Sequence, residues 1–213
     1  MRVRVVGVVC AVVLVVSGCS GKSAVEEVTS AATGSAVETG AAEVMDEPTE
    51  SVPVYVPLDE AEVGDVVEVE VPVKPEPSAA MAVNDEVGAR AAVRYFYDVI
   101  NYSGRAPDPD LIIDVGSDRC EYCEDLGKAI AEFGPNIRSA GDAQVLRSID
   151  AAKQLRDSSW IVSTTSDYPS VLLVDGDGKV TQKQNGPGVL EDQLIIEFDN
   201  GEWRLVILGE RGA

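Results

Sequence analysis

The chain has 213 residues, of which 45% are hydrophobic and only 5% aromatic, and its 37 acidic residues against 17 basic ones give a net charge of −20. This charge argues against a nucleic-acid partner, because phosphate binding requires clustered Lys and Arg. The chain contains no His, which excludes Ser-His-Asp and Cys-His nucleophile sets and the common zinc sites. We therefore expect neither a metal site nor a cofactor.

Residues 1–18 have the pattern of a secretory signal peptide. Arg2 and Arg4 precede Val5–Val16, an apolar run of 12 residues, which is shorter than the about 20 residues that a membrane span requires. The run ends in the sequence VSGC at residues 16–19, which resembles a bacterial lipobox. The resemblance implies that Cys19 is acylated and anchors the mature chain to the extracytoplasmic face of the cell membrane. The alternative is an ordinary secreted protein that is cleaved at the same place.

Residues 19–80 comprise the acylated Cys and a segment that we predict to be a disordered, acidic, Pro-rich tether. Ser20–Ala80 contains 14 acidic residues, two basic residues and a single aromatic residue. Such a segment cannot bury enough apolar surface to offset the entropy that folding would cost. Alternation of Val with acidic residues over Val66–Val73 leaves a strand as the alternative.

Residues 81–213 have the composition of one globular domain, with 13 basic and 23 acidic residues. Apolar residues at helical spacing predict a first helix over about residues 84–102, with Asn84 or Asp85 as its N-cap. The Asp-Pro pair at residues 108–109 predicts a short second helix to about residue 115. Ser117 or Asp118 then begins a third helix, which the Gly-Pro pair at residues 134–135 ends.

Strand patterns follow the three helices. They cover about residues 142–151, 159–166, 170–174, 179–184, 192–199 and 202–208. The Asn-Gly pair at residues 200–201 predicts a type I′ hairpin turn. Residues 175–178 (DGDG) predict a second turn rather than a calcium loop, because the twelfth loop position is Gly186 instead of Glu. Helices followed by an antiparallel meander predict an α+β fold.

The order of these features is similar to that of the uncharacterised actinobacterial lipoproteins of the DUF6318 type, whose domain is NTF2-like (SnoaL-like). The likeness covers roughly residues 81–208. It rests on the lipobox, the acidic tether, AVRYFYDVINY (92–102), CEYC (120–123), Trp160, VDGDG (174–178) and GEWR (201–204). The resemblance implies an NTF2-like cone in which the N-terminal helices pack on a curved antiparallel sheet. It implies no reaction.

Cys120 and Cys123 form a CxxC motif at the start of the third helix. We predict a structural disulfide, because an extracytoplasmic compartment is oxidising. A thiol redox site and a zinc or iron–sulfur site are the alternatives. No βαβ unit surrounds the motif, and the acidic residues that follow Cys120 raise the pKa of a thiolate rather than lower it.

NTF2-like cones often enclose a pocket between the sheet and the helices, so the resemblance implies a candidate pocket here. Asp98 is the carboxylate of the first helix that lies among aromatic residues, Tyr97 included. In a pocket it has the chemistry of a general base, whereas on the surface it would pair with Arg94. The candidate pocket residues are Tyr95, Asp98, Tyr102 and Trp160.

We therefore expect a membrane-anchored lipoprotein that presents its domain to an envelope protein, an envelope polymer or a small ligand. No reaction is assigned to it. A cone-type enzyme that acts on a small secreted metabolite and a CxxC thiol oxidoreductase are the alternatives. The cavities of the folded domain discriminate between them, because the enzyme requires an apolar pocket with a convergent polar group.

Overall fold

The computed structural model describes residues 55–156 and 158–211. The expected signal peptide, Cys19 and residues 20–54 of the expected tether lie outside the described residues. The chain order of the elements is η1 (Ala79–Ala82), α1 (Glu86–Arg105), α2 (Pro109–Asp114), α3 (Glu121–Phe133), β1 (Arg138–Ser139), β2 (Val145–Arg156), β3 (Ser159–Tyr168), β4 (Val171–Val174), β5 (Val180–Gln184), β6 (Gly188–Asp199) and β7 (Glu202–Glu210). Within the described ranges, no helix is long and apolar enough to cross a membrane.

The three predicted helices are present, and the caps of the first two are those that the sequence indicates. The Asp85 carboxylate accepts from the Gly88 N–H at 2.8 Å and begins α1. Asp108 accepts from the Leu111 N–H at 3.2 Å and begins α2. The third helix begins later than predicted, with Cys120 as its N-cap. Before it, Gly116 forms an isolated parallel bridge to Leu205 of β7, and the Ser117 N–H donates to the Leu205 carbonyl at 2.8 Å.

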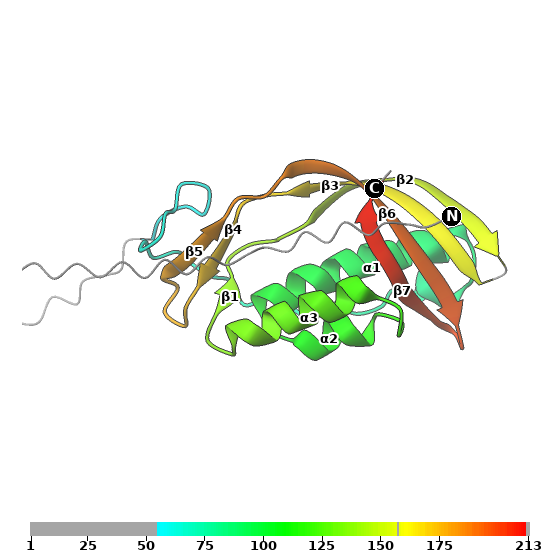
Figure 1. Ribbon diagram of the computed structural model, residues 1–213, viewed down its shortest axis with the longest axis horizontal. Coiled ribbons are helices and arrows are strands. Elements are labelled where there is room, and N and C mark those ends of the chain that lie inside the picture. Colours follow the sequence, from blue (N-terminus) through cyan, green and yellow to red (C-terminus); the bar gives the residue numbers. More distant parts are fainter. Residues whose placement is uncertain (1–54, 157, 212–213) are drawn as a thin grey trace, which may run out of the picture. The chain divides into compact units, whose positions relative to one another are not determined.

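The strands form two antiparallel sheets rather than one continuous meander. The large sheet has the order β2-β3-β6-β7 and the small sheet has the order β1-β4-β5. The β4–β5 hairpin therefore leaves the large sheet, and β6 returns to pair with β3 along its whole length (Figure 1). Strand β1, which has only two residues, was not predicted from the sequence.

Both predicted turns connect paired strands. The β6–β7 turn is a two-residue loop in which Asn200 and Gly201 have φ values of 51° and 90°, as a type I′ turn requires. In the β4–β5 turn, the Asp175 carboxylate accepts from the backbone N–H groups of Asp177 and Lys179, both at 3.0 Å.

Helices α1–α3 lie on one face of the large sheet and enclose the main core with it (Figure 1). The inward face of β3 changes character along the strand. Trp160 and Val162 are buried at one end, whereas Thr164 and Ser166 are buried at the other. The observed architecture is α+β, with N-terminal helices packed on a curved antiparallel sheet, in agreement with the predicted fold class.

Residues 55–80 differ from the predicted disordered tether. Ala61 and Val67 are 0% and 1% exposed and pack with residues of β4 and β5. The Gly64 N–H donates to the Val180 carbonyl at 2.9 Å, and the Val67 N–H donates to the Gly178 carbonyl at 3.0 Å. The ordered unit therefore begins before the predicted boundary at residue 81. Composition missed this segment because its burial depends on a partner more than 100 residues later in the chain.

Candidate functional site

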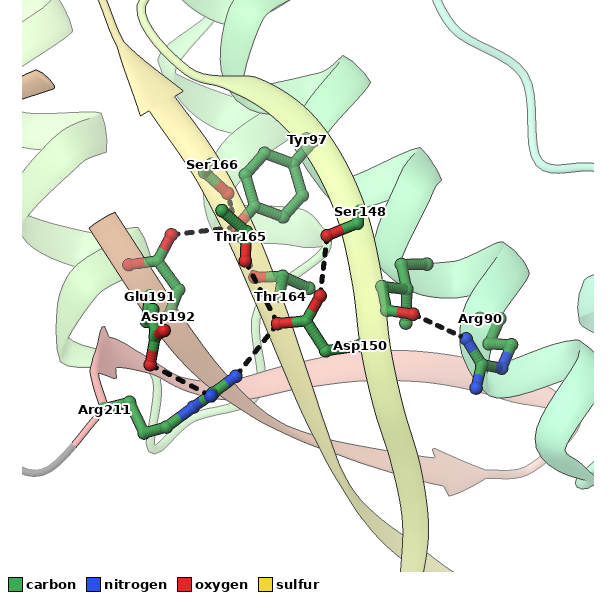
Figure 2. A network of polar contacts seen from close by, with 11 residues as sticks. Arg90, Tyr97, Ser148, Asp150, Thr164, Thr165, Ser166, Glu191, Asp192 and Arg211 are labelled. Carbon is green, nitrogen blue, oxygen red and sulfur yellow. Dashed lines mark hydrogen bonds and ion pairs between the residues drawn. The ribbon is translucent and has the colours of Figure 1, made fainter. Parts of the chain in front are cut away.

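A cluster of polar side chains lies between α1 and the large sheet, and all of its members except Tyr168 are buried. We name it the Tyr97 cluster; it comprises Tyr97, Thr164, Ser166, Tyr168 and Asp192. The Tyr97 hydroxyl donates to Asp192 Oδ2 at 3.1 Å and accepts from Ser166 Oγ at 2.7 Å. Thr164 Oγ1 lies 3.0 Å from the same hydroxyl, and the Tyr168 hydroxyl donates to Asp192 Oδ2 at 2.9 Å. Figure 2 shows Tyr97 reaching from its helix to the strands.

The register of the large sheet brings this cluster together. Inward-facing positions alternate along a strand, so Thr164 and Ser166 of β3 face the same side. Thr164 lies directly opposite Asp192 of β6. A hydroxyl has one proton and two lone pairs, and one donated and two accepted bonds use all three at Tyr97. The hydrogen bonds of Tyr97 are thus complete without a ligand.

Burial raises the pKa of the cluster's tyrosines. The pKa of Tyr97 is raised to about 12, mainly by desolvation and also by the Asp192 charge. Desolvation and the Asp192 charge also raise the pKa of Tyr168. Both hydroxyls therefore keep their protons at neutral pH and donate them to the buried carboxylate.

A second polar network lies on the opposite side of β3 (Figure 2). Thr165 points away from the cluster and donates to Asp150 Oδ2 at 3.1 Å. Arg211 binds the carboxylates of Asp150 and Glu191 at 3.1 Å and 3.0 Å. This network joins β2, β3, β6 and the residue after β7. Each exposed ion pair of this kind contributes little to the free energy of unfolding. We regard this network as a structural link between the strands.

An open cavity of about 380 Å³ lies between α1 and the start of β2, and we name it the α1–β2 cavity. Its wall reaches the Tyr97 cluster through Tyr97 itself. The lining residues from α1 are Arg94, Tyr97, Asp98 and Asn101, and the others are Asp142 and residues 144–149.

The side-chain amide of Gln144, in the wall of this cavity, has a hydrogen-bond partner at only one of its two ends among the described residues. Its side chain is 7% exposed, and its Nε2 donates to the Tyr122 hydroxyl at 2.6 Å. Its Oε1 has no hydrogen-bond partner among the described residues. Rotating the amide by 180° exchanges its two ends, so one end lacks a partner in either orientation. Unpaired buried polar groups are rare in folded proteins, and each requires an explanation.

The charged residues of the cavity are not paired with one another. Arg94 donates to the Arg90 carbonyl at 3.4 Å, and it forms no ion pair with Asp98 or any other described residue. The expected Arg94–Asp98 pair is therefore wrong. Although Asp98 is exposed as a whole residue, partial desolvation of its carboxyl raises its pKa, and the nearby charge of Asp142 raises it further. The cavity thus presents the guanidinium of Arg94 and the carboxylates of Asp98 and Asp142, and Asp142 is ion-paired with Arg105 at 3.3 Å. A second guanidinium, that of Arg147, is paired with Asp167 at 2.8 Å.

The predicted pocket residues do not gather in one place in the structure. Tyr95 and Asp98 line a hollow beside residues 76–80, and Asp98 and Tyr102 line another beside residues 70–75. Trp160 lies in the core, where its indole N–H donates to Asn84 Oδ1 at 2.9 Å.

An apolar groove of about 460 Å³ lies between η1, α2 and the β6–β7 hairpin. Met81, Tyr95, Leu111 and Trp203 line it, and Arg204 lies at its rim with the carboxylate of Glu202 at 2.5 Å. The indole Nε1 of Trp203 is buried here without a hydrogen-bond partner among the described residues, and this single donor does not define the chemistry of an occupant.

The sulfur atoms of Cys120 and Cys123 are 2.00 Å apart, which is disulfide distance. Both residues are 1% exposed. The pair encloses the first turn of α3, and a Cβ added at Gly116 would lie 2.8 Å from Cys123 Sγ. The burial leaves no solvent-facing sulfur for a redox partner, so the oxidoreductase hypothesis gains no support.

Sequence reasoning missed Gln144 and most of the Tyr97 cluster. A usable signal was present in β3, where the inward positions run Trp160, Val162, Thr164 and Ser166. Two consecutive polar residues at core-facing positions indicate a buried polar partner elsewhere in the chain. Gln144 offers no comparable signal, because it precedes β2 in a loop.

Three structures illustrate what the fold resembles. The intermembrane space region of the chloroplast protein ARC6 covers 59% of this chain and 95% of its own, at 14% identity and a TM-score of 0.43. An NTF-2 like protein of unknown function from Shewanella oneidensis MR-1 covers 56% of this chain and 96% of its own, at 9% identity and a TM-score of 0.34. A putative calcium/calmodulin dependent protein kinase II association domain from Xanthomonas campestris covers 65% and 94%, at 13% identity and a TM-score of 0.33.

Among curated proteins, no sequence matches the chain. The sequence pattern of one family, DUF6318, described as a family of unknown function, matches residues 68–208. This match extends over about two thirds of the chain and includes every helix and strand from α1 to β6 and most of β7. The chain belongs to the DUF6318 family.

Proposed function

We propose that the mature chain is attached to the membrane through acyl groups on Cys19 and presents its NTF2-like domain outside the cytoplasm as a binding module. The lipobox-like sequence at residues 16–19 supports the anchor, because acylation requires the Cys thiol and small residues before it. Several acyl chains on one residue hold a protein firmly, since each buried CH₂ contributes about 0.8 kcal/mol. The partner is an envelope protein, an envelope polymer or a small ligand, and no reaction is assigned.

The anchor is tested by cell fractionation of the Cys19→Ala variant. The unaltered chain is expected in the membrane fraction and to incorporate labelled fatty acid, whereas the variant loses both properties. Replacement of Cys10, which lies inside the expected signal peptide, is the matched control and is expected to leave both unchanged. A Cys19→Ala chain that stayed labelled and membrane-bound would refute the anchor.

We assign the binding site to the α1–β2 cavity. The observation that carries this assignment is the unpartnered amide end of Gln144 in the wall of an open cavity. An unpaired buried polar group costs about 1–3 kcal/mol, and a bound ligand can supply the missing partner. The Tyr97 cluster is a weaker candidate, because the hydrogen bonds of its central hydroxyl are already complete.

This assignment is tested by NMR titration of the full mature chain in detergent micelles with soluble fragments of digested cell wall. Amide shifts are expected to change along residues 94–101 and 142–149. The Gln144→Leu variant, which keeps the side-chain volume, is expected to weaken binding. The Gln182→Leu variant alters an exposed residue of β5 outside the cavity and is expected to bind normally. Equal effects of the two substitutions, or shifts confined to other surfaces, would refute the assignment.

A further inference from the structure

The charges of the α1–β2 cavity restrict the chemistry of its ligand. Arg94 and Asp98 both line the cavity and lie one helical turn apart on α1. Side chains at this spacing have Cβ atoms about 5–6 Å apart, which is close enough to pair. They do not pair, because the Arg94 guanidinium is turned toward the Arg90 carbonyl, so the cavity holds a positive and a negative group that are not in contact.

Asp98, Asp142 and Gln144 form what we name the negative side of the cavity, which has more hydrogen-bond acceptors than donors. Asp142 lies close enough to raise the pKa of Asp98, and its Oδ1 is ion-paired with Arg105 Nη1 at 3.3 Å, the one donor to this carboxylate among the described residues. Gln144 Oε1 adds an acceptor that has no donor among the described residues. A ligand group with several N–H donors and a positive charge satisfies this side, and a primary ammonium has three such donors. It also relieves the repulsion between the two carboxylates.

Two guanidinium groups line the cavity. That of Arg147 is paired with Asp167 at 2.8 Å, so the positive side that remains for a ligand is the guanidinium of Arg94. Arg94 is exposed and makes one backbone contact, so its remaining N–H donors are available to a ligand anion. Guanidinium groups bind carboxylates through paired hydrogen bonds. A ligand that contacts both sides therefore carries its carboxylate and its ammonium at separate ends.

We propose that the α1–β2 cavity binds a zwitterionic peptide-like ligand, with its ammonium at Asp98, Asp142 and Gln144 and its carboxylate at Arg94. This inference rests on the proposed binding function and specifies the ligand class. A free dipeptide has its ammonium and its carboxylate at separate ends. A neutral saccharide leaves the charges of Arg94 and Asp98 unpaired.

The test uses calorimetric titration of the full mature chain in detergent micelles with three probes. Alanyl-alanine carries both charges, N-acetyl-alanyl-alanine carries only the carboxylate, and alanyl-alanine amide carries only the ammonium. The zwitterion is expected to bind most tightly, and each single-charge probe is expected to bind about tenfold more weakly, as the loss of one charged hydrogen bond implies.

Two substitutions then separate the two ends of the ligand. Asp98→Asn is expected to weaken the binding of the zwitterion and of the amide, but not that of the acetylated probe. Arg94→Gln is expected to weaken the binding of the zwitterion and of the acetylated probe, but not that of the amide. Asp110→Asn and Lys153→Gln are the matched controls, because both residues are exposed and outside the cavity. Both cavity residues are also exposed, and unchanged thermal unfolding verifies that the variants fold.

Equal binding of the three probes, or equal effects of the cavity and control substitutions, would overturn the ligand class. Binding of calcium alone with the same dependence on Asp98 would overturn it too. If none of the probes binds while cell-wall fragments still change the amide shifts of the cavity residues, the zwitterionic ligand class is refuted and the proposed binding function stands. Failure of both probes and fragments at this cavity would refute both proposals.

Discussion

The hydroxyl of Tyr97 joins α1 to two strands of the large sheet. It lies in contact with Thr164, Ser166 and Asp192, which are 0%, 0% and 3% exposed. Solvent therefore supplies no replacement when this hydroxyl is removed. The neighbouring Tyr95 is half-buried and makes no hydrogen bond through its hydroxyl within the described structure, so the two tyrosines form a natural comparison.

We expect Tyr97→Phe to lower the free energy of unfolding by about 2–3 kcal/mol, because several buried groups lose a partner at once. Tyr95→Phe is expected to change it by less than about 0.5 kcal/mol. Denaturant unfolding of both variants provides the measurement. Equal effects at the two positions would show that the buried cluster contributes nothing specific.

The raised pKa of Tyr97 predicts a loss of stability in alkali. Unfolded tyrosine titrates near pH 10, whereas folded Tyr97 titrates near 12, so the unfolded chain releases this proton first. The contribution is complete below about pH 10 and decreases by about 1.4 kcal/mol per pH unit as the pH rises toward 12. Unfolding curves between pH 8 and pH 12 measure this slope. The slope is expected to become shallower in Tyr97→Phe, and an unchanged slope would contradict the prediction.

At the scale of the element, α1 shows how packing overrides helix propensity. Gly88 lies in its first turn, where Ala favours a helix by about 1 kcal/mol over Gly. A Cβ added there would lie 2.0 Å from the Val83 carbonyl oxygen. The backbone before α1 thus passes so close to the helix that a side chain has no room.

We expect Gly88→Ala to destabilise the domain by about 1–3 kcal/mol, as overpacking against backbone does. Gly209→Ala in β7 is the matched control, because a Cβ there meets nothing within 4 Å. Thermal unfolding of the two variants compares them. A stabilised Gly88→Ala chain would mean that the approach of residue 83 to α1 is looser than the structure has it.

The short disulfide at the start of α3 is a second feature of this scale. Cross-linking residues three positions apart closes a small loop, for which the chain-entropy relation gives about 2 kcal/mol. We expect the Cys120→Ala, Cys123→Ala double variant to lose about this amount and to keep its fold. Calorimetry measures the loss, and a chain that failed to fold without the bridge would contradict the expectation.

At the scale of the whole molecule, local patterns were sufficient to predict the helices, most strands and both turns. Capping residues, apolar periodicity and the Asn-Gly pair act over a few residues, and a sequence displays them directly. The division into two sheets and the Tyr97 cluster depend on pairings between distant positions. Tyr97 and Asp192 are 95 residues apart, and neither residue's neighbours indicate the other.

The packed segment before α1, residues 55–80, is the clearest case of structure that amino-acid composition does not predict. We expect Val67→Ala to lower the free energy of unfolding by about 1–2 kcal/mol, because this side chain is 1% exposed. Val71→Ala is the matched control, since Val71 is 84% exposed, and it is expected to have almost no effect. Denaturant unfolding compares the two. A neutral Val67→Ala would restore the view of this segment as an unstructured tether.

The attachment of residues 56–67 to the small sheet also determines how tension would act on the domain. A pull from the N-terminal side first loads the bond from the Val56 N–H to the Val66 carbonyl, and then the bonds at Gly64 and Val67. The Gly64 N–H and the Asp65 carbonyl both bond to Val180 and share the load, whereas the bonds at Val56 and Val67 lie on either side of them along the chain. We therefore expect a pull from this side to detach residues 56–67 from the small sheet before it loads α1.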